Sequence, residues 1–229
     1  AAESTPAPPL RVFCYNIHHG EGLDGKVDLG RIAQLIKNSG AHVAALQEVD
    51  RNMGRTQRVD LAKELARQLG WTAYFSPNLR TKDGGEYGNA LLTALPVSTW
   101  KNTIFPLGRP TEPRGLLQAT VRFQEQEIEI LTTHLDSDRR DDERLRQAPA
   151  ILAALAQLPT NRPFVLCGDF NVAWDERDVA KPDNWRDGVL FHPDAVALLH
   201  TVVQGAGLAD TLRMHHAEAN LLSWWDYRN

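Results

Sequence analysis

An apolar segment that ends in polar residues, FVLCGDFN at residues 164–171, constrains the fold most strongly. Its apolar run closes on Gly168, which predicts a buried strand that leaves its sheet at this point. Because side chains alternate along a strand, Asp169 and Asn171 are expected on one side and Phe170 on the other. An acid and an amide at the end of a buried strand are costly unless they pair or bind something. A plain strand-to-turn connection is the competing interpretation, because Asp and Asn are common turn residues.

Length and composition indicate one soluble domain. The chain has 229 residues, 42% hydrophobic and 24% charged, which is enough for one sizeable core. We expect a single domain over residues 10–229, preceded by a proline-rich, disordered tail over residues 1–9. That tail fits the remainder of a cleaved export signal as well as an arbitrary chain boundary, so the compartment stays open. No apolar window approaches the roughly 18 residues of a membrane span.

The net charge limits the possible binding partners, and the cysteine content indicates the state of the thiols. A net charge of -4 and a pI near 6.1 exclude a globally basic nucleic-acid binder, so such a partner would need a local basic patch or a metal. Cys14 and Cys167 both lie in apolar runs. We expect them to be buried, reduced thiols rather than a disulfide or a metal pair.

Apolar periodicity predicts strands and helices interspersed along the chain, with hairpins among the strands. Pro149 is expected to weaken and kink one helix, and a glycine-rich turn is expected at residues 84–89. The mixture favours an α/β or α+β layered fold over a plain parallel doubly wound sheet. Strands are expected at residues 10–17, 43–46, 71–75, 90–93, 115–123, 127–133 and 164–167, and helices at 28–38, 59–69, 141–158 and 195–204.

Polar side chains of the kinds that a metal–phosphate site needs stand at four strand ends. Mg²⁺ prefers oxygen ligands and takes one or two carboxylates with water and substrate phosphate, which makes Glu48 and Asp169 the obvious pair. His134 can donate a hydrogen bond to a phosphate or move a proton. Each residue alone fits a solvated loop or a structural role, but four such ends favour a site. They are Asn16 with His18 and His19, Gln47 with Glu48, His134 with Asp136, and Asp169 with Asn171.

Zinc chemistry and serine chemistry fit less well. The sequence has no cysteine pair at ligand spacing and no His-x-x-x-His helix. The adjacent pairs His18–His19 and His215–His216 would point in opposed directions if extended, so neither pair is expected to chelate a metal. No Gly-x-Ser-x-Gly segment marks a serine nucleophile.

One ordered set of motifs resembles the endonuclease/exonuclease/phosphatase superfamily, from about residue 10 to the end. The resemblance implies a four-layer αββα sandwich, in which two mixed sheets pack face to face under helices. It also implies hydrolysis of phosphoester bonds with Mg²⁺ or Mn²⁺. The motifs are Asn16, Gln47-Glu48, Gly88-Asn89-Ala90-Leu91-Leu92, Thr133-His134-Leu135 and Gly168-Asp169-Phe170-Asn171.

The same resemblance assigns roles to single residues. Glu48 is implied as the main metal ligand, with Asn16 and Asp169 beside it. His134 would bind the scissile phosphate, Asp169 would orient or activate the attacking water, and Asn171 would hold the phosphoryl group. An arginine from a segment similar to the phosphatase-like members would face the phosphate, which suits a guanidinium fork; a surface charge on an edge strand is the alternative. The implied phosphate contacts are Arg114, Asn89 and His19.

The two ends of the chain resemble different branches of this superfamily. Residues 10–171 are similar to small phosphatase-like hydrolases, and residues from about 171 onward resemble the exonuclease III group. A natural mosaic and a deliberate recombinant both stay open. The family pattern continues with an Arg-x-Asp strand and a Ser-Asp-His motif that this sequence lacks. The resemblance therefore implies a sheet without its last strand or strands, an exposed edge open to self-association, and a site without its catalytic histidine.

The sequence thus predicts a divalent-metal-dependent phosphoesterase that cleaves phosphodiester or phosphomonoester bonds by in-line water attack. One alternative is an exonuclease III-like DNA nuclease or AP endonuclease. From another class, a catalytically impaired binding module or an incomplete or chimeric member stays open. The DNA alternative rests on residues that would stack on bases or meet phosphates, with packing as the competing fate of the tryptophans: Trp174, Trp185, Trp224, Trp225, Arg177, Arg186 and Arg228.

Overall fold

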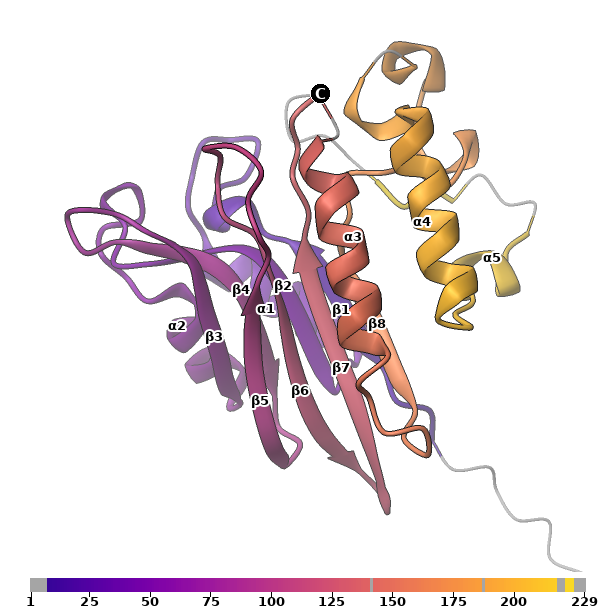
Figure 1. Cartoon of the computed structure of the whole chain (residues 1–229). Helices are drawn as coiled ribbons and strands as arrows, with labels where there is room; N and C mark the ends of the chain where they lie inside the picture. Colours follow the sequence, from indigo (N-terminus) through magenta and orange to yellow (C-terminus); the bar gives the residue numbers. More distant parts are fainter. Residues whose placement is uncertain (1–7, 141, 187, 218–220, 225–229) are drawn as a thin grey trace, which may run out of the picture.

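The computed structural model describes residues 8–140, 142–186, 188–217 and 221–224, and its strands form two four-stranded sheets (Figure 1). The first sheet has the order β1 (Val12–Asn16), β2 (Val43–Arg51), β4 (Glu86–Thr93), β3 (Thr72–Arg80). The second has the order β5 (Val97–Ile104), β6 (Gly115–Phe123), β7 (Gln126–His134), β8 (Phe164–Asp169). The helices are α1 (Leu29–Ser39), α2 (Leu61–Leu69), α3 (Asp142–Leu155), α4 (Pro193–Gly205) and α5 (Thr211–His215).

Each sheet combines antiparallel pairs with one parallel pair, and the parallel pairs carry the polar strand ends. β1 runs parallel to β2 and β7 runs parallel to β8. Their registers set Asn16 beside Gln47 and His134 beside Asp169. Since parallel strands end at the same edge of a sheet, both sheets present these polar ends together.

Side-chain alternation along β2 explains the layers. Val43 and Ala45 pack between the two sheets, whereas Ala44 and Leu46 pack under α1 and α2. On the far side of the second sheet, a third core joins Leu131 to residues of α3 and α4. The molecule is therefore a four-layer αββα sandwich of two mixed sheets, as the family resemblance implied (Figure 1).

The predicted helices are present, with small shifts in their ends. Asp28 caps α1 by accepting a hydrogen bond from the backbone of Arg31, and α2 starts after Asp60, two residues later than predicted. The helix expected at 141–158 is described over 142–155 and runs through Pro149. Asp141 lies outside the described residues.

Several strand predictions need correction. β5 was not predicted, because this edge strand (VSTWKNTI) is mostly exposed and has no apolar run. β2 continues beyond residue 46, past a bulge. Residues 86–89 belong to β4 rather than to a turn. Gly88 is needed there for a different reason, because a Cβ atom would lie 2.1 Å from the Ser76 carbonyl oxygen.

The outer side of β1 and β8 is more exposed than predicted. Within the described part of the chain, each of these strands pairs on one side only. Every residue of β8 is therefore half-buried rather than buried, and Cys14 on β1 is exposed. Both cysteines are free thiols, as expected. None of the described helices combines the length and apolarity needed to cross a membrane.

Candidate active site

Asn16 joins the two sheets at their polar end. Its amide nitrogen donates to Glu48 Oε1 at 2.8 Å and to Asp169 Oδ2 at 2.9 Å. Its amide oxygen accepts the backbone N–H of His18 at 3.0 Å. One side chain from β1 therefore holds two carboxylates, from β2 and β8, that are distant in the sequence. Asn16 thus brings three of the four polar strand ends together.

A β-bulge in β2 directs Glu48 to this meeting point. The pairing of β2 with β4 shifts between Leu46 and Val49, and Glu48 adopts a left-handed φ of 58°. Bulges insert an extra residue that re-aims a side chain, and they are common next to active sites. A left-handed conformation costs a non-glycine residue about 1–3 kcal/mol. The fold thus bears strain to place this carboxylate beside Asn16.

Asp169 and Asn171 form a fixed turn at the end of β8. Asp169 Oδ1 accepts the backbone N–H of Asn171 at 3.1 Å, while its Oδ2 accepts from Asn16. Asn171 is buried, has a left-handed φ of 50°, and donates to the Leu135 carbonyl at 3.0 Å. Before it, Gly168 has a φ of 148°, and a Cβ atom there would lie 2.1 Å from the Thr133 carbonyl oxygen. Glycine is therefore required where β8 delivers Asp169.

His134 lies against Arg114 in the interior of the site. Arg114 Nη1 donates to His134 Nδ1 at 3.0 Å, so the imidazole proton resides on Nε2. His134 Nε2 lies 3.8 Å from Asp169 Oδ2. Burial, followed by the positive charge of Arg114, lowers the pKa of His134 to about 4. At neutral pH His134 is therefore an uncharged hydrogen-bond donor.

Arg114 is a buried cation rather than a surface charge. It is 6% exposed, and its Nη1 also contacts Glu112 Oε1 at 2.7 Å. Its Nε atom has no hydrogen-bond partner among the described residues. Burial raises the pKa of Glu112, which the positive charge of Arg114 opposes. A guanidinium with an unused donor suits an anionic ligand.

Three further groups around Glu48 were not singled out by the sequence analysis. Asp50 is fully buried and takes two hydrogen bonds of 2.8 Å from Arg55, whose guanidinium lies 5.4 Å from the centre of the Tyr87 ring. Burial, and then the charge of Glu48, raises the pKa of Tyr87. The glycine-rich segment at residues 84–89, which contains Tyr87, was the available signal, but it does not show that Tyr87 or Arg55 lies near Glu48.

The expectation that His18 and His19 diverge is wrong. Both residues have left-handed backbones, with φ of 45° and 43°, so the segment is not extended. Their ring centres are 4.4 Å apart. Each histidine and Glu48 offers one ligand atom, and these three atoms lie within 4.8 Å of one another. The three residues are therefore a possible metal-binding cluster.

Asn89, expected at the phosphate, is buried and donates to the Gly115 carbonyl at 3.2 Å. This contact fixes the start of β6 directly after Arg114. Asp136, another predicted strand end, is also buried, and it accepts a hydrogen bond of 3.2 Å from Thr111. Both residues support the loops around the site.

The three described tryptophans that were proposed for DNA contacts pack against other side chains of the protein. Trp185 and Trp224 meet edge to face at 4.7 Å in a small apolar cluster with Leu190. Trp174 stacks on His200 at 3.8 Å. Packing therefore accounts for these three rings, as the competing interpretation held. Of the two described arginines of that set, Arg177 pairs with Asp175, and Arg186 pairs with Asp183 and Glu176. Trp225 and Arg228 lie outside the described residues.

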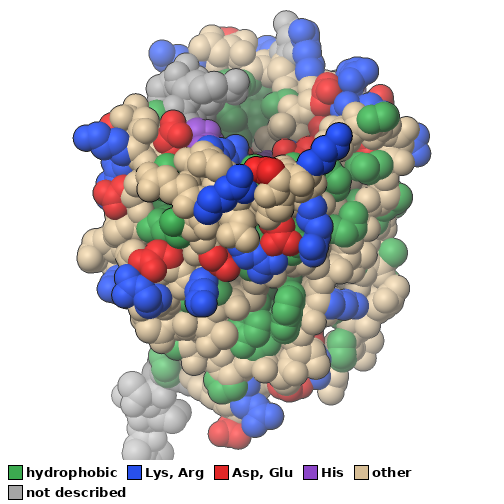
Figure 2. Space-filling view, turned by 90° about the vertical axis from the view of Figure 1, so that its left-hand side faces the viewer, with side chains coloured by type: hydrophobic (Ala, Val, Ile, Leu, Met, Phe, Trp, Pro, Cys, Tyr) green, Lys and Arg blue, Asp and Glu red, His purple; other side chains and the backbone are tan. Residues whose placement is uncertain are grey.

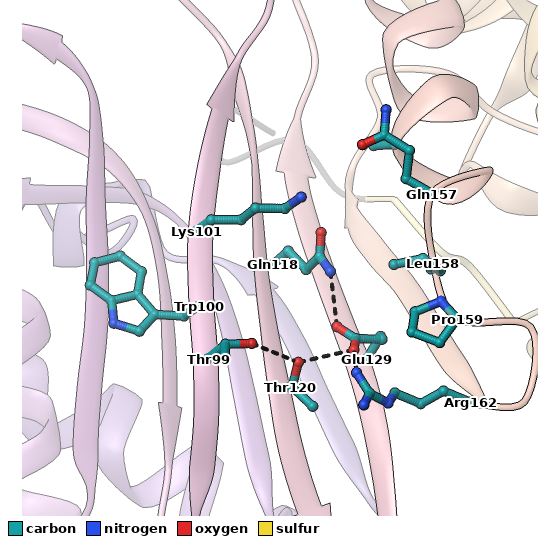
Figure 3. A pocket seen from close by; sticks show the side chains of 11 residues that line it. Thr99, Trp100, Lys101, Gln118, Thr120, Glu129, Gln157, Leu158, Pro159 and Arg162 are labelled. Atoms are coloured by element: carbon teal, nitrogen blue, oxygen red, sulfur yellow. Dashed lines mark hydrogen bonds and ion pairs between the residues drawn. The ribbon is translucent and has the colours of Figure 1, made fainter.

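A cavity of about 230 Å³ lies elsewhere, on the outer face of the second sheet beside the end of α3 (Figure 3). At its floor Glu129 accepts hydrogen bonds of 2.9 Å from Gln118 and Thr120 and pairs with Arg162. Glu129 precedes His134 by five residues on β7, toward the opposite end of the sandwich. The carboxylate of Glu129 is therefore fully paired within the protein. The cavity lies away from the polar strand ends and is not part of that site.

The residues at the strand ends fit a divalent cation. Glu48 and Asp169 bring two carboxylates to one amide group, and oxygen atoms of this kind are the ligands of hard cations. The buried Arg114 and the half-exposed Arg55 supply positive charge nearby. Figure 2 shows a small histidine patch in the upper left part of this face, near acidic and basic side chains.

Comparisons with known proteins agree with this arrangement. Residues 13–226 match the model of the Endonuclease/Exonuclease/phosphatase family. An exodeoxyribonuclease of Bacillus subtilis (strain 168) is 30% identical over 114 residues, which are 48% of this chain and 44% of that protein. The chain thus matches less than half the length of this relative.

Two solved structures share the fold. An endonuclease/exonuclease/phosphatase from Beutenbergia cavernae DSM 12333 has a TM-score of 0.68 at 23% identity, covering 89% of this chain and 55% of that one. An AP endonuclease from Archaeoglobus fulgidus has a TM-score of 0.68 at 19% identity, covering 96% of this chain and 80% of that one. By its sequence match over most of its length, this chain belongs to the Endonuclease/Exonuclease/phosphatase family.

Proposed function

We propose that the chain is a divalent-metal-dependent phosphoric ester hydrolase that uses in-line attack by water. The observation that carries this proposal is the bridge of Asn16 between Glu48 and Asp169, across two sheets. Holding two carboxylates together is costly without a cation. Family members are hydrolases of the nuclease and phosphatase classes, which agrees with this chemistry.

In this proposal Glu48, Asn16 and Asp169 hold Mg²⁺ or Mn²⁺. Neutralisation of charge on the scissile phosphate is the chemistry that a bound ion supplies there. Asp169 orients the attacking water and accepts its proton, because both carboxylate oxygens are fixed by hydrogen bonds. A fixed carboxylate loses little orientational freedom in the transition state.

The phosphate is proposed to bind between the buried donors. His134 offers its Nε2–H, and Arg114 offers the Nε–H that has no partner in the described structure. Asn171 holds the phosphoryl group from the end of β8, and Asn89 is proposed as a further contact. Donors that are positioned in advance stabilise charge that develops in the transition state, by about 3–4 kcal/mol each in measured cases.

The substrate class has two candidates, a small phosphoester and DNA. The similarity to an exodeoxyribonuclease favours DNA. The packing of Trp174, Trp185 and Trp224 within the protein removes the stacking argument made from the sequence. Turnover of abasic-site duplex DNA, inositol phosphates and an aryl phosphodiester, each with and without Mg²⁺, separates the two. Binding that falls steeply with salt would favour DNA.

Glu48→Gln tests the proposal, with Glu125→Gln as the matched control in the exposed turn between β6 and β7. We expect Glu48→Gln to lower metal-dependent turnover by about 100-fold or more, while Glu125→Gln behaves as wild type. Unchanged turnover in Glu48→Gln would refute the site. If wild type shows no turnover with Mg²⁺ or Mn²⁺, and its melting temperature ignores both ions, the non-catalytic alternative is correct.

Self-association through the open edges is also proposed. β1 and β8 carry apolar, half-buried side chains and pair on one side only in the described structure. Such edges template pairing between chains. We expect the apparent mass in size-exclusion chromatography with light scattering to rise with concentration. A constant monomer mass would refute this.

A further inference from the structure

We infer that His18, His19 and Glu48 form a second cation site, which binds a divalent transition metal in preference to Mg²⁺. This site shares Glu48 with the proposed catalytic ion, so the inference rests on the proposed function. Its ligand atoms lie within 4.8 Å of one another. Metal bonds of about 2.1 Å place ligands roughly 3.4 Å apart, so modest side-chain rotations close the site.

The ligand chemistry sets the class of metal. Mg²⁺ and Ca²⁺ prefer oxygen ligands, whereas imidazole suits Zn²⁺, Co²⁺, Fe²⁺ and related ions. Two histidines and one carboxylate, with room for water, is a recurring set for catalytic zinc and for non-haem iron. The imidazoles of His18 and His19 therefore give this site a preference for transition metals that a site with oxygen ligands alone would not have.

Glu21 holds both imidazoles by one nitrogen each. Its carboxylate lies 3.3 Å from His19 Nε2, and its backbone carbonyl lies 3.4 Å from His18 Nδ1. Metal-binding histidines almost always direct the second ring nitrogen to a carboxylate or a carbonyl in this way. The arrangement assigns His19 Nδ1 as a metal-binding atom.

His19 gives an independent indication of a ligand site. The residue is 7% exposed, and its Nδ1 has no hydrogen-bond partner among the described residues. A buried polar atom without a partner costs about 1–3 kcal/mol. A metal bound at Nδ1 would remove that cost.

Backbone strain at all three residues points the same way. His18, His19 and Glu48 have left-handed φ values of 45°, 43° and 58°. Each costs about 1–3 kcal/mol, and such residues cluster at ligand sites where the surrounding structure enforces them. An extended backbone would separate the two rings, so the strain is what brings them beside Glu48.

Binding of Co²⁺ to the metal-free full chain, in the presence of excess Mg²⁺, tests this inference by calorimetry and visible absorption. We expect wild type to bind one Co²⁺. The affinity for Co²⁺ should fall by about 10-fold to 100-fold in His18→Ala and in His19→Ala. The control is the double variant His215→Ala/His216→Ala, which removes an exposed adjacent pair and should bind as wild type. His18→Gln, at a half-buried position, provides a second variant if His19→Ala fails to fold.

The outcomes separate the two proposals. Wild-type Co²⁺ affinity in both single-histidine variants, or no Co²⁺ binding by wild type, overturns the second site even if Mg²⁺ supports hydrolysis. Co²⁺ binding that depends on His18 and His19 supports the second site even if no phosphoester is hydrolysed. Loss of binding in Glu48→Gln supports the shared carboxylate, and retention there at full affinity excludes it.

Discussion

The burial of His134 predicts a defined loss of stability in mild acid. Burial, with the charge of Arg114, lowers its pKa from 6.5 to about 4. Between these values the unfolded chain binds a proton that the folded chain does not, so stability falls as the pH falls. The contribution is complete above about pH 6.5 and is lost toward pH 4. At about 1.4 kcal/mol per pH unit, this interval amounts to about 3 kcal/mol.

Urea unfolding of wild type and His134→Gln, in EDTA between about pH 7.5 and 4.5, measures this contribution. Gln cannot titrate, so over this pH range the free energy of unfolding of wild type should fall by about 2.5 kcal/mol more than that of the variant. Burial raises the pKa of Glu112, which acts in the opposite direction. That residue is present in both proteins, so its effect cancels in the comparison. Parallel curves for the two proteins would refute the reasoning.

Two substitutions test the packing around the site. Gly168→Ala should destabilise the protein by about 3 kcal/mol, because its Cβ would lie 2.1 Å from the Thr133 carbonyl oxygen; thermal unfolding measures this, and a wild-type melting temperature would contradict it. Asp50→Ala should cost about 2 kcal/mol, since it removes the buried acceptor of Arg55. Its control, Asp83→Ala, removes an exposed ion pair and should change stability little; equal losses in both variants would contradict the role of burial.

Most helices and strands were predictable because local signals in the sequence agree with one another, whereas the four-layer arrangement followed from the family resemblance. Alternation in β7, the Asp28 cap and the glycine after α1 each favour the observed element. The edge strand β5 was missed because exposure removes the apolar pattern that identifies a strand. The half exposure of β8 was missed for a related reason. A continuous apolar run is typical of a central strand of a sheet. Whether a strand is central or at the edge depends on its pairing partners, which the sequence of the strand itself does not reveal.

The polar strand ends were predictable as a set, whereas their geometry was not. Chain order and residue type selected Asn16, Glu48, His134 and Asp169, and Asn16 joins two of them directly. The bulge at Glu48 has no sequence signal, because its left-handed residue is neither Gly nor Asn. The same reason explains the error over His18–His19, since an extended backbone is the ordinary expectation for consecutive non-glycine residues.

The burial of His134 beside Arg114 changes the role that its residue type had suggested. His134 stands at the end of a predicted strand, and histidine is the residue type that most often moves a proton in a reaction, so the sequence suggested it for this role. Burial beside Arg114 keeps it uncharged at neutral pH, so it has no acidic proton to give to a leaving group. In the proposed reaction, His134 therefore serves as a neutral hydrogen-bond donor to the phosphate, held in place by its contact with Arg114.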